Sequence, residues 1–367
     1  MNPQQKHPNM IRTERLIRIR SIVCCSAIGL VLGSTVSVRA VDIVTRRSDN
    51  VTLRGELTKS DTSEVVLKKT NGEEVTVSVA DLKSVQFDGE PLNLNQARSN
   101  ERSGAFDSAL EKLAEVQSSY TGSDKRLQTE LQFLTARVQG LQALIDSSKA
   151  DAAIDALEKF RTANKTNFRY LEATLLQAAV HAVKKEADAG KALLSEVQSS
   201  PVRGFQLQAG VDLGRLLLES GDAAGALAAF DGVVQKSQGD DSALAAHYDG
   251  MLGRALCLQK QNQHDDALKT LDEIIEKASQ SETRILADAW NRKGDSLRQK
   301  NDIKAALVAY LHVDVLYPGE AVQHAEALLR LSQLWGPCGH EDRAVEASAK
   351  LAERYPNTVW AKQKSGS

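Results

Sequence analysis

The chain has 367 residues, of which 42% are hydrophobic and 26% are charged, and this composition excludes a wholly disordered or collagen-like protein. Only 4% of the residues are aromatic, a bias that favours packed helices over a β-sandwich or barrel. The formal net charge of -2 excludes a chain that is basic throughout, as nucleic-acid-binding proteins often are.

Residues 1–40 have the pattern of a secretory signal peptide. A basic start, which includes Arg12, Arg15 and Arg18, precedes an apolar run from Ser21 to Val38. Small apolar residues then stand at Val38 and Ala40, so we expect cleavage after Ala40. The alternative is an uncleaved N-terminal membrane anchor, because a run of about 18 residues is the lower limit for crossing a bilayer. The pattern therefore predicts an exported protein, periplasmic or extracellular.

Residues 41–90 are expected to form a small all-β module. β-Branched residues that tend to alternate with polar ones predict five strands, at Asp42–Arg46, Asn50–Lys59, Glu64–Thr70, Glu73–Ser78 and Ser84–Phe87. Asn71-Gly72 predicts a hairpin, since both residues accept a positive φ, and Gly55 predicts a bend or bulge. This layout resembles the Sm-like and related small barrels of bacterial exported proteins. The resemblance implies an interaction or anchoring unit.

Residues 91–362 are expected to be helical repeats, which makes the fold class mostly α. The clearest copy runs from Trp290 to Pro318, and its small and apolar residues are Trp290, Gly294, Leu297, Ala306, Tyr310, Val313 and Pro318. This spacing resembles the tetratricopeptide repeat, although Lys293 stands where an apolar residue is usual. The resemblance implies helix pairs that touch at Gly294 and Ala306 and stack into a right-handed solenoid with a continuous core.

The same register recurs about seven times and is strongest over residues 205–356. The small residues expected at the helix contact in the second helix of each copy are Ala109, Ala153, Ala189, Ala226, Ala267, Ala306 and Ala344. Residues 363–367 are expected to be a short tail. Cys257 and Cys338 lie in copies that are not neighbours, so free thiols are expected.

The sequence contains no common catalytic motif, and we expect neither an enzyme nor a cofactor. The most metal-like stretch is Cys338-Gly339-His340-Glu341-Asp342, which lacks a second pair of Cys or His ligands nearby. We interpret it as the turn between the two helices of the last copy, with Gly339 in the turn. No metal site is predicted.

The tetratricopeptide resemblance implies that the first helix of each pair lines a concave groove that holds peptides. The side chains expected to face this groove and contact a partner are Gln208, Arg215, Asp249, Gln259, Asp288, Asn291, Asp295, Arg298 and Gln333. Val211, Leu218, Leu252, Leu256, Glu326 and Leu329 are expected on the same face. The Lys/Asn clamp of some chaperone-binding members is not carried over, because Asp295 stands at the matching Asn position. A peptide with basic and apolar side chains is expected to suit this groove.

These features together predict an exported, non-catalytic adaptor or scaffold that binds proteins or peptides outside the cytosol. Nucleic acid is not an expected partner. The alternative is a structural component of the cell envelope, with the β module as its anchor and the solenoid as a spacer.

Overall fold

The computed structural model describes residues 41–364. The predicted signal peptide, residues 1–40, lies outside the described residues, as do residues 365–367 of the predicted tail. Within residues 41–364, every helix is too short or too polar to cross a membrane.

Five antiparallel strands form the first part of the described chain, residues 42–86, as the sequence predicts. They are paired in the order β4-β3-β2-β1-β5, and their bounds are β1 Asp42–Arg46, β2 Thr52–Ser60, β3 Glu64–Lys68, β4 Glu74–Ser78 and β5 Leu82–Gln86. A single 3-10 turn, η1 (Val79–Asp81), connects β4 to β5. The resemblance to a small closed barrel stays a prediction, because pairing among the described residues ends at β4 and β5.

Strand β2 changes its pairing partner at Gly55, where a bend or bulge is predicted, and the irregularity in its register with β3 lies between Leu57 and Lys59. Residues up to Gly55 pair with β1 and those after it pair with β3. A Cβ atom at Gly55 would lie 2.5 Å from the carbonyl oxygen of Lys68, so only glycine allows this approach of two backbones. One strand can therefore contribute to both halves of the sheet.

The β3–β4 hairpin forms at Asn71-Gly72, but only Gly72 has a positive φ, of 88°. The amide of Lys69 donates to the carbonyl of Glu73, and the amide of Gly72 donates back to Lys69, so the loop has three residues. The side-chain oxygen of Asn71 instead accepts a hydrogen bond from the Glu73 amide at 3.0 Å. The predicted hairpin is confirmed, and in this longer loop only one of the two residues that accept a positive φ adopts it.

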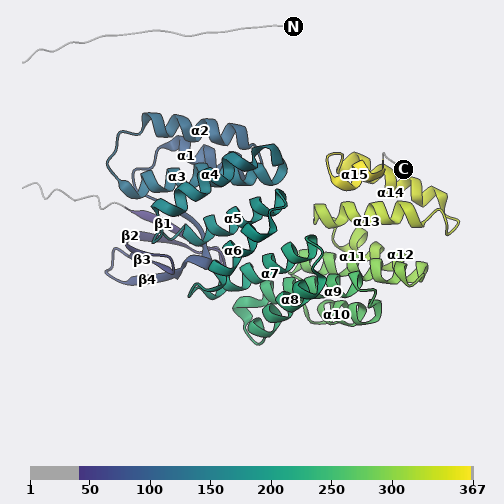
Figure 1. Ribbon diagram of the computed structural model, residues 1–367. Helices are drawn as coiled ribbons and strands as arrows, with labels where there is room; N and C mark the ends of the chain where they lie inside the picture. The colour runs from purple at the N-terminus through teal and green to yellow at the C-terminus, as the bar shows by residue number, and fades with distance from the viewer. Residues whose placement is uncertain (1–40, 365–367) are drawn as a thin grey trace, which may run out of the picture. The chain divides into compact units, whose positions relative to one another are not determined.

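Fifteen α-helices follow the sheet in the described part of the chain, and the first fourteen form seven consecutive pairs that pack in chain order (Figure 1). Their bounds are α1 Leu92–Arg102, α2 Phe106–Ser119, α3 Lys125–Ile145, α4 Ala150–Ala163, α5 Tyr170–Val183, α6 Ala187–Gln198, α7 Arg203–Glu219, α8 Ala223–Ser237, α9 Leu244–Lys260, α10 His264–Lys277, α11 Thr283–Gln299, α12 Ile303–Leu316, α13 Ala321–Leu334, α14 Glu341–Arg354 and α15 Val359–Lys364. The predicted class, mostly α with a preceding β module, is confirmed.

Small residues occupy the predicted contact in the second helices, with one correction. Six of the predicted alanines are buried and are the fourth residue of their helix. In α6 the fourth residue is Gly190, which is buried, whereas Ala189 is only half-buried. A Cβ atom at Gly190 would lie 3.0 Å from the side chain of Leu216, so glycine avoids a tight contact there. The predicted register was wrong by one position in this copy.

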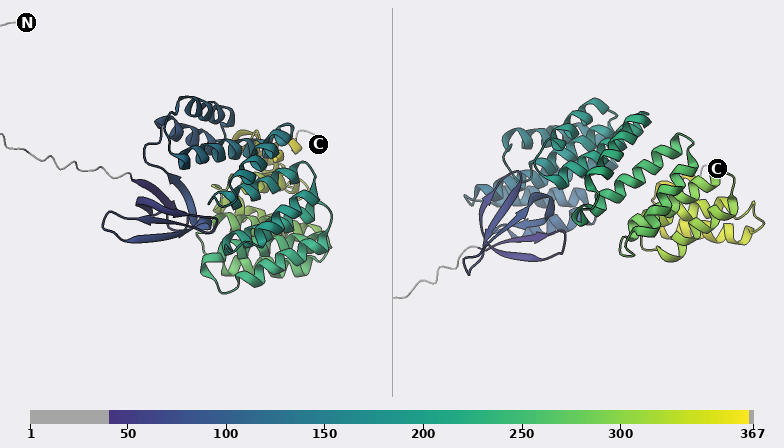
Figure 2. Two further views of the ribbon diagram at one scale, coloured as in Figure 1. Left: turned by 60° about the vertical axis from the view of Figure 1, so that its left-hand side comes forward. Right: turned by 90° about the horizontal axis from the view of Figure 1, so that it is seen from below.

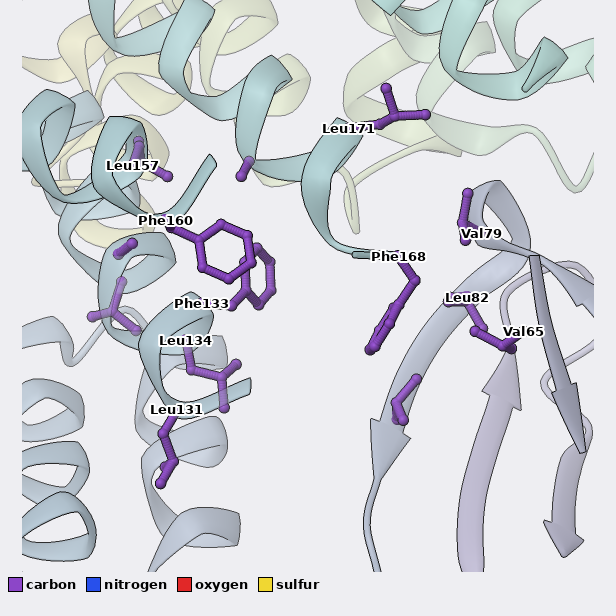
Figure 3. Close-up of a cluster of buried hydrophobic side chains, with 14 of the residues drawn as sticks. Val65, Val79, Leu82, Leu131, Phe133, Leu134, Leu157, Phe160, Phe168 and Leu171 are labelled. Carbon is purple, nitrogen blue, oxygen red and sulfur yellow. The ribbon is translucent and has the colours of Figure 1, made fainter. Parts of the chain in front are cut away.

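The core of the sheet continues into the core of the first helices. One buried cluster includes strand residues such as Val65 and Leu82 together with Phe133 of α3 and Leu157 of α4. Figure 3 shows Phe168, just before α5, between the sheet and the helical side chains. Asp42 of β1 also pairs with Arg126 of α3 at 2.9 Å. The sheet accordingly lies against the first helix pairs in both views of Figure 2.

Candidate binding face

Helices α7, α9, α11 and α13 are the first helices of four successive pairs, and each contacts the next. All nine predicted partner-contacting residues lie on these helices. We call the side of the four helices that carries these residues the first-helix face. Gln208, Arg215 and Gln333 are exposed there, whereas Asp249, Gln259, Asp288, Asp295 and Arg298 are half-buried.

Asn291 does not face solvent, in contrast to its predicted role. The residue is 0% exposed, and its side-chain amide donates to the backbone carbonyl of Gln323 at 2.9 Å. Glu326, Leu252 and Leu329, expected on the same face, are also buried. A residue that faces the neighbouring first helix is covered by that helix. The 3.6-residue period of the sequence does not distinguish such a residue from one on the adjacent, solvent-facing side. Asn291 therefore joins α11 to α13.

A row of charges connects α7, α9 and α11 on the first-helix face. Gln208 and Arg215 both contact the carboxylate of Asp212, at 3.0 and 3.3 Å. Arg215 also lies 3.8 Å from Asp249 of α9, which Arg284 of α11 approaches to 2.8 Å. Burial raises the pKa of Asp212 despite these contacts. The acids of this row are thus already neutralised by arginines of the same chain.

A second charge cluster is centred on Arg292, between α11 and α13. Its guanidinium lies 3.1 Å from Asp288, 3.0 Å from Asp295 and 2.8 Å from Glu326. Gln259 of α9 donates to the Arg292 carbonyl at 2.6 Å. Sequence reasoning missed Arg292, although the spacing of Asp288, Arg292 and Asp295 by four and three residues is the signal of charge pairing on one helix.

Glu326 is the acid of this cluster whose ionisation is the most perturbed. Burial raises its pKa to about 7, and Asp295 and Asp288 add to the rise while Arg292 opposes it. The side chain is buried, and its Oε1 atom has no hydrogen-bond partner. Glu326 therefore changes charge near neutral pH.

We expect the variant Glu326→Gln to lose a pH dependence of stability that the parent chain has. The unfolded chain releases the Glu326 proton near its ordinary pKa of 4.5, whereas the folded chain keeps it up to about 7. The folded state thus holds the extra proton between these values, so its stability falls as the pH rises through this window, by about 3 kcal/mol. Urea unfolding at about pH 5 and about pH 8 measures the change.

The control for this variant is Glu273→Gln, which changes an exposed acid on α10 that pairs with Lys277. It should keep the pH dependence of the parent chain. A parent chain and a Glu326→Gln variant with parallel stability curves would contradict the assignment of this dependence to Glu326.

The part of the chain that the structure describes contains no disulfide and no cluster of metal ligands. Cys257 and Cys338 are free thiols, as predicted, and burial raises the pKa of Cys257 to about 11. Cys338-Gly339-His340 lies between α13 and α14, where Gly339 has a φ of 84° and the His340 amide donates to the Trp335 carbonyl. Residues 41–364 contain no group of three or more potential metal ligands.

Comparison with known proteins identifies the repeat. Residues 217–287 match the tetratricopeptide repeat family. The apo form of RapI has a similar structure, with a TM-score of 0.53 and 10% identity over 75% of this chain and 78% of RapI. A tetratricopeptide repeat protein from Parabacteroides merdae gives a TM-score of 0.51 and 14% identity over 74% of this chain and 95% of its own. No curated protein matches in sequence. The described part of the chain is a mostly helical solenoid like those of tetratricopeptide repeat proteins, preceded by a five-stranded antiparallel sheet.

Proposed function

We propose that this chain is an exported, non-catalytic adaptor that binds other proteins or peptides through its first-helix face. The observation that carries the proposal is the continuity of this face: four first helices, each in contact with the next, carry exposed Gln208, Arg215 and Gln333. Stacked repeats offer such extended surfaces for binding.

The arrangement of the charged residues also supports binding rather than catalysis. The acids Asp249, Asp288 and Asp295 are held by arginines or by a tyrosine of the same chain. A carboxylate fixed in this way positions its neighbours and is poorly suited to act as a general base. The proposal of an adaptor without enzymatic activity rests on this pairing and on the lack of a catalytic motif in the sequence.

The extracytoplasmic location is proposed from the sequence of residues 1–40 alone. A basic start, an apolar run and small residues at Val38 and Ala40 favour export and cleavage. Retention of the same segment as an anchor would keep the chain at the membrane. Detection of a mature N-terminus at Val41 would support cleavage, and detection of Met1 in the envelope fraction would support the anchor.

Site-specific photocrosslinking in the native cell tests the adaptor role. A photoreactive residue at Gln208 or at Gln333 is expected to capture a defined partner protein. Matched probes at exposed positions of second helices, Lys269 on α10 and Val308 on α12, should not capture it. Asp295 is unsuitable for this test, because Tyr310 and Arg292 depend on its carboxylate.

Equal capture from both kinds of position, or capture from neither, would contradict binding at the first-helix face. A chain that captures no partner and yet stays with the envelope pellet would favour the alternative of a structural spacer.

A further inference from the structure

A cavity of about 340 Å³ opens on the first-helix face where α9 and α11 end. Lys260 at the end of α9, His264 at the start of α10, Arg298 near the end of α11 and Arg330 of α13 line it. Three of these side chains are permanent cations under ordinary conditions, and they come from three different helices. The stacking of successive repeats, and not any one helix, brings them together.

The only acid that lines the cavity, among the residues the structure describes, is Asp295. Its carboxylate accepts a hydrogen bond from the Tyr310 hydroxyl at 2.8 Å and pairs with Arg292 at 3.0 Å. Arg330 and Arg298 stand further away, at 3.5 and 4.0 Å. The Asp295 carboxylate is thus already bound by Tyr310 and Arg292. The positive charge of the three cations that line the cavity therefore exceeds the negative charge of its single acid.

Hydrogen-bonding groups without partners gather at the same place. Seven side-chain nitrogen or oxygen atoms of the described residues are buried and lack a partner, and three of them belong to the lining: His264 Nδ1, Arg298 Nε and Arg330 Nε. Both Nε atoms are N–H donors of cationic side chains, whereas His264 Nδ1 donates or accepts according to the tautomer of its ring. An acceptor that a ligand brings to the cavity would meet two guanidinium groups that share a single carboxylate, Asp295.

We propose that this cavity binds the carboxylate of an aspartate or glutamate side chain of a partner polypeptide. Guanidinium N–H groups donate to carboxylates in strong, charge-assisted hydrogen bonds, and Lys260 adds a further positive charge at the rim. The first-helix face continues on either side, toward exposed Gln208 of α7 and exposed Gln333 of α13. A polypeptide can therefore continue in both directions from the cavity, which favours an internal side chain over a chain terminus.

This assignment rests on the proposed function and revises the chemistry expected of the partner. The acidic residues of the face predicted a partner with basic side chains. In the structure those acids are paired with Arg215, Arg284 and Arg292, and the cavity beside them is lined by the cations Lys260, Arg298 and Arg330. An acidic partner complements these donors, and a basic partner would be repelled by Lys260 and Arg298.

Binding of defined peptides to the purified full chain tests the assignment. The probe is a fluorescently labelled, C-terminally amidated peptide of alternating alanine and glutamate, and the matched peptide carries glutamine in place of glutamate. The parent chain should bind the glutamate peptide and not the glutamine peptide. Arg298→Gln and Arg330→Gln should each weaken binding by about tenfold to a hundredfold. Lys269→Gln, an equal charge change on the outer side of α10, should leave it within about twofold.

Far-ultraviolet circular dichroism and thermal unfolding of each variant establish that it is folded. Equal binding of the two peptides, no binding of either at millimolar concentration, or unchanged binding by both folded arginine variants would overturn the carboxylate cavity. A preference for a neutral peptide with a free C-terminus would overturn the side-chain assignment in favour of a terminal carboxylate. Photocrosslinking to a partner at Gln333 would still support the adaptor role in each of these cases, so the two proposals fail separately.

Discussion

Replacement of Phe230 by alanine is expected to lower the free energy of unfolding by about 3–5 kcal/mol. The Phe230 ring is 1% exposed and lies between two first helices. A Cβ atom at Gly214 of α7 would lie 2.6 Å from the ring, and one at Gly253 of α9 would overlap it as well. Both glycines thus leave the space that the ring fills. Because glycine has no side chain, neither residue can fill that space after Phe230 is truncated to alanine.

Urea unfolding followed by far-ultraviolet circular dichroism measures this loss. The control is Val308→Ala on α12, where the side chain is 53% exposed and the expected change is within about 0.5 kcal/mol. Introduction of Gly253→Ala into the Phe230→Ala variant should recover part of the stability, because a methyl group then enters the vacant space. A loss below about 1 kcal/mol in the single variant would show that α7 and α9 do not depend on this ring.

The register that placed Phe230 could be predicted because local spacing encodes it. Phe230 stands at the position that Tyr310 has in the clearest copy, where Gly294, Ala306 and Tyr310 recur at intervals fixed by the contact between two paired helices, and that contact requires small residues opposite a ring. The strands were predictable for a similar reason, since alternation and the turn at Gly72 act within a few residues. The error at Ala189 arose because Gly190, its neighbour, is also small and the sequence offered two registers.

Contacts between distant segments could not be predicted in this way. Arg126 and Asp42 are separated by 84 residues, and nothing in their local sequence marks them as partners. Arg284 of α11 was likewise invisible as a partner of Asp249, because that acid lies on the neighbouring helix α9. The face consequently seemed acidic in sequence, whereas its acids are paired and its cavity is lined by three cations.

Replacement of Arg169 by methionine is expected to cost about 3–5 kcal/mol, because it leaves Glu130 buried without its partner. Arg169 lies at the start of α5 and is 5% exposed, and its guanidinium contacts both carboxylate oxygens of Glu130 in α3, at 2.7 and 3.1 Å. The same group lies over the rings of Phe133 and Phe168, at 4.8 and 4.9 Å from the ring centres. The pair therefore joins two successive first helices next to the sheet.

The double variant Arg169→Met with Glu130→Leu separates two explanations of such a loss. If the single variant is unstable because a charge is left unpaired, removal of that charge should restore most of the stability, since apolar side chains can replace a buried ion pair. If the loss comes instead from the missing stacking on Phe133 and Phe168, the double variant should stay as unstable as the single one. Arg254→Met, which removes an exposed pair with Asp231, should change stability by less than about 1 kcal/mol in the same urea titration. A single Arg169→Met variant as stable as this control would show that the junction of the sheet with α3 and α5 depends on its apolar contacts alone.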